Sequence, residues 1–213
     1  MGQGAQPSGS RVGGPVTARL PCYPPPMAEP ARKRATRADL ETLPESVVGE
    51  LIAGVLHTFP RPRPRHARAA SGLGGDLVGP YDRGRSGPGG WWILDEPGVA
   101  LPALDIEEIV PDLGGWRRER LPALPEGSIT LAPDWVCEVL SPTTRAHDLK
   151  RKRPLYAQAG VGWMWIVDTD ARTLTASRLH DGRWLELGTW SDDDVVRIEP
   201  FDAVEIRLAD LWG

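Results

Sequence analysis

Short apolar segments rich in β-branched and aromatic residues recur through the second half of the chain. Segments 106–110, 135–140 and 163–167 are each bounded by Pro, Gly, Asp or Ser, which is typical of buried strands. The more polar stretch between the last two predicts a helix that ends at Gly160 or Gly162. A strand, a helix and a second strand in this order predict a right-handed parallel crossover.

Weaker patterns extend the prediction toward both ends of the chain. Residues 47–59 place β-branched side chains around Gly54 and predict a hairpin, while small residues at 66–77 favour a helix. The run 91–97 predicts another strand. After Asp168, the segments TLTASRL, RWLELGTW and VVRIEP predict an antiparallel meander. These elements predict an α/β fold with a mixed β-sheet core flanked by helices, and with antiparallel strands added at the C-terminal end.

The amino-terminal residues differ from the rest of the chain in composition. Gly, Pro, Ser and Ala dominate them and there is almost no periodic apolar pattern, so residues 1–35 are expected to form a disordered tail. A methionine at Met27 leaves open that translation starts there. The folded domain is expected to span 36–213, with Thr36 as the cap of a short first helix.

Charge and hydropathy exclude a membrane-spanning protein and a globally basic one. With 25 basic and 29 acidic residues the net charge is −4, so any contact with nucleic acid must come from a local basic patch. Arg65, Arg117 and Arg118 lie in two arginine-rich segments that suit such contacts, and solvated loops are the alternative. No uncharged apolar run is long enough for a bilayer. Two cysteines and the lack of a secretory signal favour a cytoplasmic protein.

Two carboxylates are candidates for chemistry. Because side chains alternate along a strand, Glu138 shares one face of segment 135–140 with Val136 and Leu140. Burial of an unpaired carboxylate costs several kcal/mol, so a buried Glu138 needs a positive partner or a metal ion. An edge strand that leaves Glu138 in water explains the pattern equally well. Asp112 follows a proline further upstream, where an ordinary Pro-Asp turn is the alternative.

A lysine on the predicted crossover helix is the third candidate. Lys152 and Tyr156 are four residues apart, so they share one helical face, which we expect to point toward the sheet. Pro154 belongs in a first helical turn and places the beginning of the helix near residues 150–153. A solvated basic face over residues 150–153 is the alternative for Lys152.

The combination resembles a known family. The segment PDWVCEVLSPTTRAHDLKRKRPLYAQAGVGWMWIVD is similar to the signature of the Uma-type "putative restriction endonuclease" family, a former domain of unknown function within the PD-(D/E)XK nuclease superfamily. The resemblance continues upstream through GELIAGVLH, His66, WWILDEPGVAL and VPDLGGWRRERLP, and so covers roughly 36–213. It implies a restriction-endonuclease-like fold, in which a four-stranded mixed sheet is flanked by helices.

The resemblance also implies a catalytic centre of Asp112, Glu138 and Lys152. Leu140 stands two residues after Glu138, so the usual Glu-x-Lys pair is broken, and the family pattern places the basic residue on the next helix, at Lys152. Lys152 would orient or deprotonate the attacking water, or hold the scissile phosphate. The candidates for supporting roles are Glu50, His66, Asp148 and Tyr156.

The implied activity is metal-dependent hydrolysis of phosphodiester bonds in DNA. Members of the superfamily often dimerise to cut both strands, so the resemblance leaves a homodimer open. Asp112 and Glu138 would hold Mg²⁺ or Mn²⁺, since Mg²⁺ prefers one or two carboxylates and keeps several waters. Such cations activate water and stabilise charge in phosphoryl transfer. The first alternative is a catalytically inactive, nuclease-like module that binds nucleic acid. The second is a structural ion-pair network around the same carboxylates.

Overall fold

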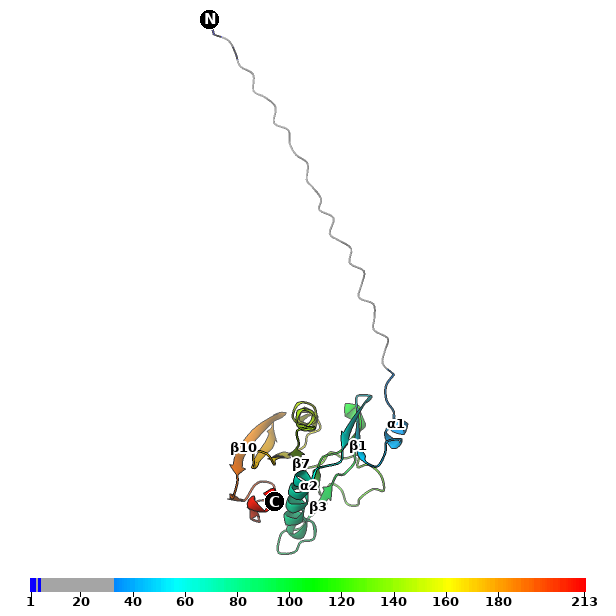
Figure 1. Ribbon diagram of the computed structural model, residues 1–213, viewed down its shortest axis with the longest axis vertical. Coiled ribbons are helices and arrows are strands. Elements are labelled where there is room, and N and C mark those ends of the chain that lie inside the picture. The colour runs from blue at the N-terminus through cyan, green and yellow to red at the C-terminus, as the bar shows by residue number, and fades with distance from the viewer. Residues whose placement is uncertain (3, 5–32) are drawn as a thin grey trace. The chain divides into compact units, whose positions relative to one another are not determined.

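The computed structural model describes Met1, Gly2, Gly4 and residues 33–213. The chain divides into two units, Met1–Lys33 and Arg34–Gly213, and the described residues of the first have no regular secondary structure. The predicted tail and the alternative start at Met27 concern residues that lie almost wholly outside this description. The helices and strands that are described belong to the second unit (Figure 1).

A six-stranded mixed sheet forms the centre of the second unit. Its strand order is β10-β9-β8-β7-β6-β3. The strands are β3 (Trp91–Asp95), β6 (Leu113–Arg117), β7 (Trp135–Leu140), β8 (Trp163–Asp168), β9 (Thr173–His180) and β10 (Arg183–Ser191). β7 and β8 are parallel, and the other neighbouring pairs of this sheet are antiparallel. The predicted mixed α/β fold is therefore confirmed, and the central position of β7 buries all six of its residues.

A smaller antiparallel sheet has the order β2-β1-β5-β4. Its strands are β1 (Val47–Ile52), β2 (Val55–Pro60), β4 (Val99–Leu101) and β5 (Ile106–Ile109). Ala53 and Gly54 form the two-residue turn between β1 and β2 with φ angles of 53° and 70°. Positive φ at both turn residues matches the right-handed twist of a hairpin, and the hairpin predicted at 47–59 is confirmed.

The segment VVRIEP does not join the main sheet. β11 (Val195–Val196) pairs with β12 (Ile206–Arg207) in a separate two-stranded sheet. The predicted three-stranded meander is therefore correct for β9 and β10 and wrong for the third segment. The physical reason lies in the core: Val196, Ile198 and Phe201 are buried against the aromatic residues of the main sheet, so this segment covers the sheet instead of extending it.

Helices cover both faces of the main sheet. α2 (Pro64–Leu77) buries Leu73 and Leu77 in the same apolar core as Trp135 and Val139 of β7. Tyr156, on the crossover between β7 and β8, belongs to a second core with the opposite-facing Val136. The remaining short elements are α1 (Arg37–Glu41), η1 (Val78–Asp82), η2 (Pro102–Leu104) and α5 (Ala209–Trp212). None of the helices in the described part is long and apolar enough to cross a membrane.

The crossover helix begins earlier than Pro154 predicts. α3 (Arg145–His147), the π-helical turn η3 (Asp148–Lys152) and α4 (Arg153–Gln158) follow one another without a break. Within this turn, the Arg153 N–H donates to the Asp148 carbonyl five residues earlier. This wider turn leads directly into α4. Pro154 lies in the first turn of α4, as the sequence predicts.

Candidate active site

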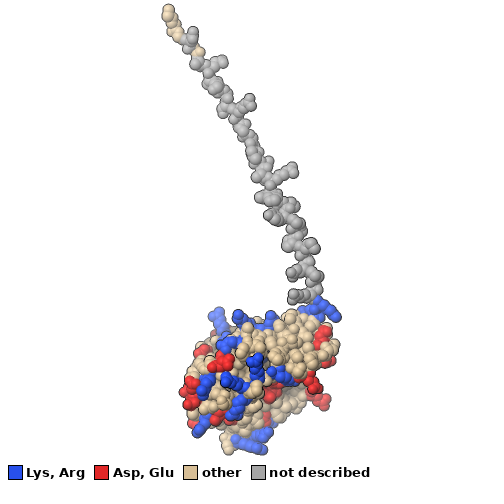
Figure 2. Space-filling view, viewed as in Figure 1, with Lys and Arg blue, Asp and Glu red and all other residues tan. Residues whose placement is uncertain are grey.

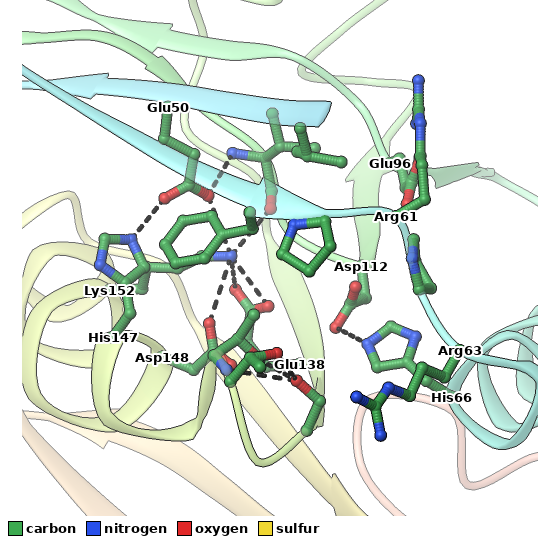
Figure 3. Close-up of a pocket in the computed structure, with 18 of the residues that line it drawn as sticks. Glu50, Arg61, Arg63, His66, Glu96, Asp112, Glu138, His147, Asp148 and Lys152 are labelled. Atoms are coloured by element: carbon green, nitrogen blue, oxygen red, sulfur yellow. Dashed lines mark hydrogen bonds and ion pairs between the residues drawn. The ribbon is translucent and has the colours of Figure 1, made fainter. Parts of the chain in front are cut away.

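A pocket lies beside the central strand, where the hairpin β1–β2, the start of α2, the end of β7 and the turn η3 meet (Figure 3). Its ionisable lining residues are Glu50, Arg61, Arg63, His66, Glu96, Asp112, Glu138, His147, Asp148 and Lys152. Six of the seven residues predicted for catalytic or supporting roles are among them. The seventh, Tyr156, reaches the site through its contact with Glu138.

The sheet register brings the two predicted acids together. Leu113 of β6 is paired with Cys137 of β7, so the next residues outward, Asp112 and Glu138, lie at the end of this antiparallel pair. The Val139 N–H donates to Asp112 Oδ2 at 2.7 Å, which fixes the aspartate against β7. Glu138 is only 1% exposed. The alternative of an edge strand with Glu138 in water is thereby excluded.

Lys152 lies between two carboxylates. Its Nζ is 2.8 Å from Glu138 Oε1, 2.9 Å from Glu138 Oε2 and 3.2 Å from Glu50 Oε1, and it donates to the Val110 carbonyl at 2.8 Å. Burial disfavours the ammonium, but the carboxylates of Glu138 and Glu50 outweigh burial and hold the pKa of Lys152 well above its ordinary value. Lys152 therefore stays protonated at neutral pH, which favours a fixed positive charge over a base that deprotonates water.

Glu50 links the lysine to a histidine that the sequence did not single out. His147 Nε2 lies 2.5 Å from Glu50 Oε2, and the Val110 N–H donates to Glu50 Oε1 at 3.1 Å. Burial opposes ionisation of Glu50, but Lys152 and His147 lower its pKa to about 2. The carboxylate of Glu50 is thus ionised and holds Lys152 and His147 on one side of the pocket.

Replacing Glu50 by glutamine should reduce the acid sensitivity of the fold. The pKa of Glu50 falls from 4.5 to about 2 on folding, so its ionised form contributes stability above pH 4.5, which is lost as the pH falls toward 2. This lowering corresponds to about 3 kcal/mol. We expect E50Q to have a free energy of unfolding about 3 kcal/mol below the unsubstituted protein at neutral pH, with a smaller difference near pH 3. Urea unfolding over this pH range measures it.

The matched control for that experiment is Glu126→Gln. Glu126 is exposed and has no ion pair or hydrogen bond within the described part of the chain, so this variant should change stability by no more than about 0.5 kcal/mol at either pH. A loss in E50Q that does not depend on pH would contradict an ionised Glu50 in the native state.

Tyr156 and Asp148 complete the surroundings of Glu138 and Lys152. The Tyr156 hydroxyl donates to Glu138 Oε1 at 2.7 Å, and Asp148 Oδ1 lies 3.8 Å from Lys152 Nζ. Burial raises the pKa of Glu138 well above its ordinary value, Lys152 opposes this rise, and Asp148 and Asp112 add to it. The centre is therefore crowded with acidic groups that one ammonium only partly compensates.

His66 is the partner of the other acid. Its Nε2 lies 3.2 Å from Asp112 Oδ2, and its buried Nδ1 has no hydrogen-bond partner in the described part of the chain. Burial opposes protonation of the imidazole, but Asp112 outweighs it and raises the pKa of His66. Figure 3 shows His66 and Asp112 together on the side of the pocket opposite Glu50 and His147.

The structure does not bring the predicted nucleic-acid contacts to this pocket. Arg65, Arg117 and Arg118 are absent from its lining. Arg118 donates to Asp82 Oδ1 at 2.8 Å and lies 3.5 Å from the ring centroid of Trp92, so its guanidinium is held by the fold. Contact between these arginines and nucleic acid stays a prediction.

The carboxylates suit a hard divalent cation. Among the residues that the structure describes, no three His, Cys, Asp or Glu side chains form a metal cluster, as a zinc site with three or four protein ligands would require. Mg²⁺ needs fewer, because it takes one or two carboxylates and retains waters. Asp112 Oδ1 has no partner within the described part, and Glu138 keeps one of its roughly four acceptor sites. The donor set of Asp112 and Glu138 therefore fits Mg²⁺ or Mn²⁺.

Comparisons with known proteins identify the family of the chain and support its fold. Residues 37–209 match the Uma2 family, described as "Putative restriction endonuclease". No curated protein matches the chain. The structure is similar to the crystal structure of "a putative nuclease belonging to DUF820" from Anabaena variabilis, with a TM-score of 0.63 and 21% sequence identity over 82% of this chain and 96% of that chain. At this identity the likeness concerns the fold.

Proposed function

The chain belongs to the Uma2 "Putative restriction endonuclease" family, and on this premise we propose that it hydrolyses phosphodiester bonds of DNA at a centre formed by Asp112, Glu138 and Lys152. The observation that carries the proposal is the convergence of two acids from neighbouring strands and a buried ammonium in one pocket. The same three residue types make up the centre of the nuclease superfamily that the sequence resembles.

Each residue has a role that its contacts support. Asp112 is the more accessible acid, with 18% of its side chain exposed, and its Oδ1 has no partner in the described part of the chain. Glu138 is the buried acid, positioned by Tyr156 and Lys152. Mg²⁺ or Mn²⁺ held by these acids would supply an activated water and stabilise negative charge on phosphorus. Lys152 keeps its proton, orients Glu138, and provides a fixed positive charge beside the reacting phosphate.

The alternative is a module with the same fold that binds nucleic acid without cutting it. Glu138 is ion-paired with Lys152 and accepts a hydrogen bond from the Tyr156 hydroxyl. Asp112 Oδ2 is in contact with His66 and accepts a hydrogen bond from the Val139 N–H. Side chains and backbone groups of the protein therefore already supply most of the partners of these carboxylates without a metal ion. This observation favours the second function.

Incubation of the purified protein with supercoiled plasmid separates the two functions. The proposal expects nicked or linear DNA with Mg²⁺ or Mn²⁺, and intact plasmid in EDTA. Linear product without a nicked intermediate would fit a homodimer, because two centres are needed to cut both strands together. Binding of the plasmid without cutting in either cation would contradict the proposed hydrolysis and support the binding module.

A further inference from the structure

The helical segment that carries Lys152 also presents two cationic side chains outside the pocket. Lys150 and Arg151 are exposed, and neither has an ion pair or hydrogen bond within the described part of the chain. Both line a second groove, which runs from Ala53 of the β1–β2 turn to Pro154. His147 lines this groove and the candidate active-site pocket alike, so the two hollows lie on either side of one residue.

Arg63 is a third cation without a partner among the described residues, and it lies on the side of the pocket away from His147. Arg63 precedes α2, is exposed and lines the pocket, and it has no ion pair or hydrogen bond among the described residues. Its neighbour Arg61, by contrast, is paired with Glu96 at 3.1 Å. Figure 3 shows Arg63 beside His66, on the side of the pocket opposite His147. Free cations thus flank the candidate centre at both ends.

We propose that the pocket and the second groove form one track for a DNA strand, in which Arg63 binds phosphate on one side of the acids and Lys150 and Arg151 bind phosphates on the other. This inference rests on the proposed function, since it takes the same pocket as the centre. With a net charge of −4, the protein can attract a polyanion only through local cations. Exposed cations without carboxylate partners are the ones that can neutralise phosphates without first breaking an internal ion pair.

Basic side chains gather on one face of the molecule (Figure 2). On the face shown in Figure 2, Lys and Arg side chains gather along the top and through the middle, while Asp and Glu side chains lie mainly toward the margins. Arg117 and Arg118 line neither hollow. Arg118 would have to leave Asp82 before it could bind a phosphate, whereas Lys150 and Arg151 would leave no partner.

Metal-free DNA binding at several salt concentrations tests the track. The probe is a fluorescein-labelled 20-base-pair duplex, titrated in EDTA and followed by fluorescence anisotropy. Because each lost phosphate contact lowers the slope of log K against log salt by about 0.9, the variant K150A/R151A should lose nearly two in slope. We expect its affinity to be about tenfold weaker at moderate salt, and R63A to lose about one in slope.

The matched control is R183A/R207A. Arg183 and Arg207 are exposed, line neither hollow, and have side chains without an ion pair or hydrogen bond in the described part. This variant therefore removes the same charge and should keep the original slope. An unchanged slope in K150A/R151A, or an equal loss in the control, would overturn the track. The assay contains no divalent cation and needs no cleavage. A protein that binds through these cations but never cuts plasmid would therefore overturn the proposed hydrolysis alone.

Discussion

Replacing Lys152 by methionine is expected to destabilise the folded protein by about 3–5 kcal/mol at neutral pH, because removal of one partner of a buried ion pair leaves uncompensated charge. Lys152 is 4% exposed and is the cation shared by Glu138 and Glu50, with Asp148 close by. Methionine keeps an unbranched apolar side chain but leaves these carboxylates facing one another. Urea unfolding at neutral pH measures the loss.

The pH dependence of this loss identifies its cause. The pKa of Lys152 is raised in the folded protein, so the lysine contributes its full stabilisation to the fold at every pH below the ordinary lysine pKa. This contribution therefore does not change between pH 5 and pH 7. Without the ammonium, burial raises the pKa of the facing carboxylates, and their protonation relieves the repulsion as the pH falls. The deficit of K152M should therefore shrink at about pH 5.

Two further variants make this result specific to the charge. K150M removes an exposed lysine from the same turn and should stay within about 0.5 kcal/mol of the unsubstituted protein. K152M/E138Q removes the lysine together with the most buried of its carboxylate partners and should recover part of the loss, because one uncompensated charge fewer remains. A K152M variant as stable as K150M would show that the carboxylates do not depend on the ammonium.

Strand order explains why the sequence left the environment of Glu138 open. Alternation along 135–140 predicts correctly that Glu138 shares a face with Val136, but it does not say whether the strand is central or at an edge. That property depends on the pairing of β7 with β6, which lies upstream, and with β8, which lies downstream. Once both pairs form, burial of Glu138 follows.

β6 shows a second limit of the local pattern. LGGWR contains two glycines and follows a Pro-Asp pair, so it is typical of a turn, yet it forms a strand. The glycines are required by packing: a Cβ on Gly114 would lie 2.8 Å from the ring of Trp116, and one on Gly115 would lie 3.0 Å from the ring of Trp135. Propensity alone therefore misjudges a strand whose surface is covered by indole rings.

The basic run at 150–153 and the missed histidine have related explanations. Helical geometry turns Lys152 inward while Lys150 and Arg151 stay exposed, so the predicted site and its solvated alternative each describe part of the run. His147 had no local signal, because its partner Glu50 lies 97 residues away on the hairpin. A polar contact between a strand and a distant helix appears only when the fold is known.

Replacing Asp112 by asparagine should reduce metal-dependent DNA cleavage by about 10³-fold. Asparagine keeps the size of the side chain, and its carbonyl oxygen can still accept the hydrogen bond of the Val139 N–H. It removes the negative charge of the more accessible acid, and the electrostatic stabilisation that a bound cation gives a phosphoryl transition state is worth several kcal/mol. A loss of about 4 kcal/mol corresponds to this factor in rate.

Titration of the protein with Mn²⁺, followed by electron paramagnetic resonance without DNA, gives a second and independent measurement. D112N should bind Mn²⁺ at least about tenfold more weakly, since one of the two proposed carboxylate ligands has lost its charge. The control is D170N, whose aspartate is exposed and outside both hollows, and it should behave like the unsubstituted protein. If D112N bound Mn²⁺ and cut DNA at unchanged levels, Asp112 could not belong to the centre. Weaker Mn²⁺ binding together with lost cleavage would place cation and chemistry at the same carboxylate.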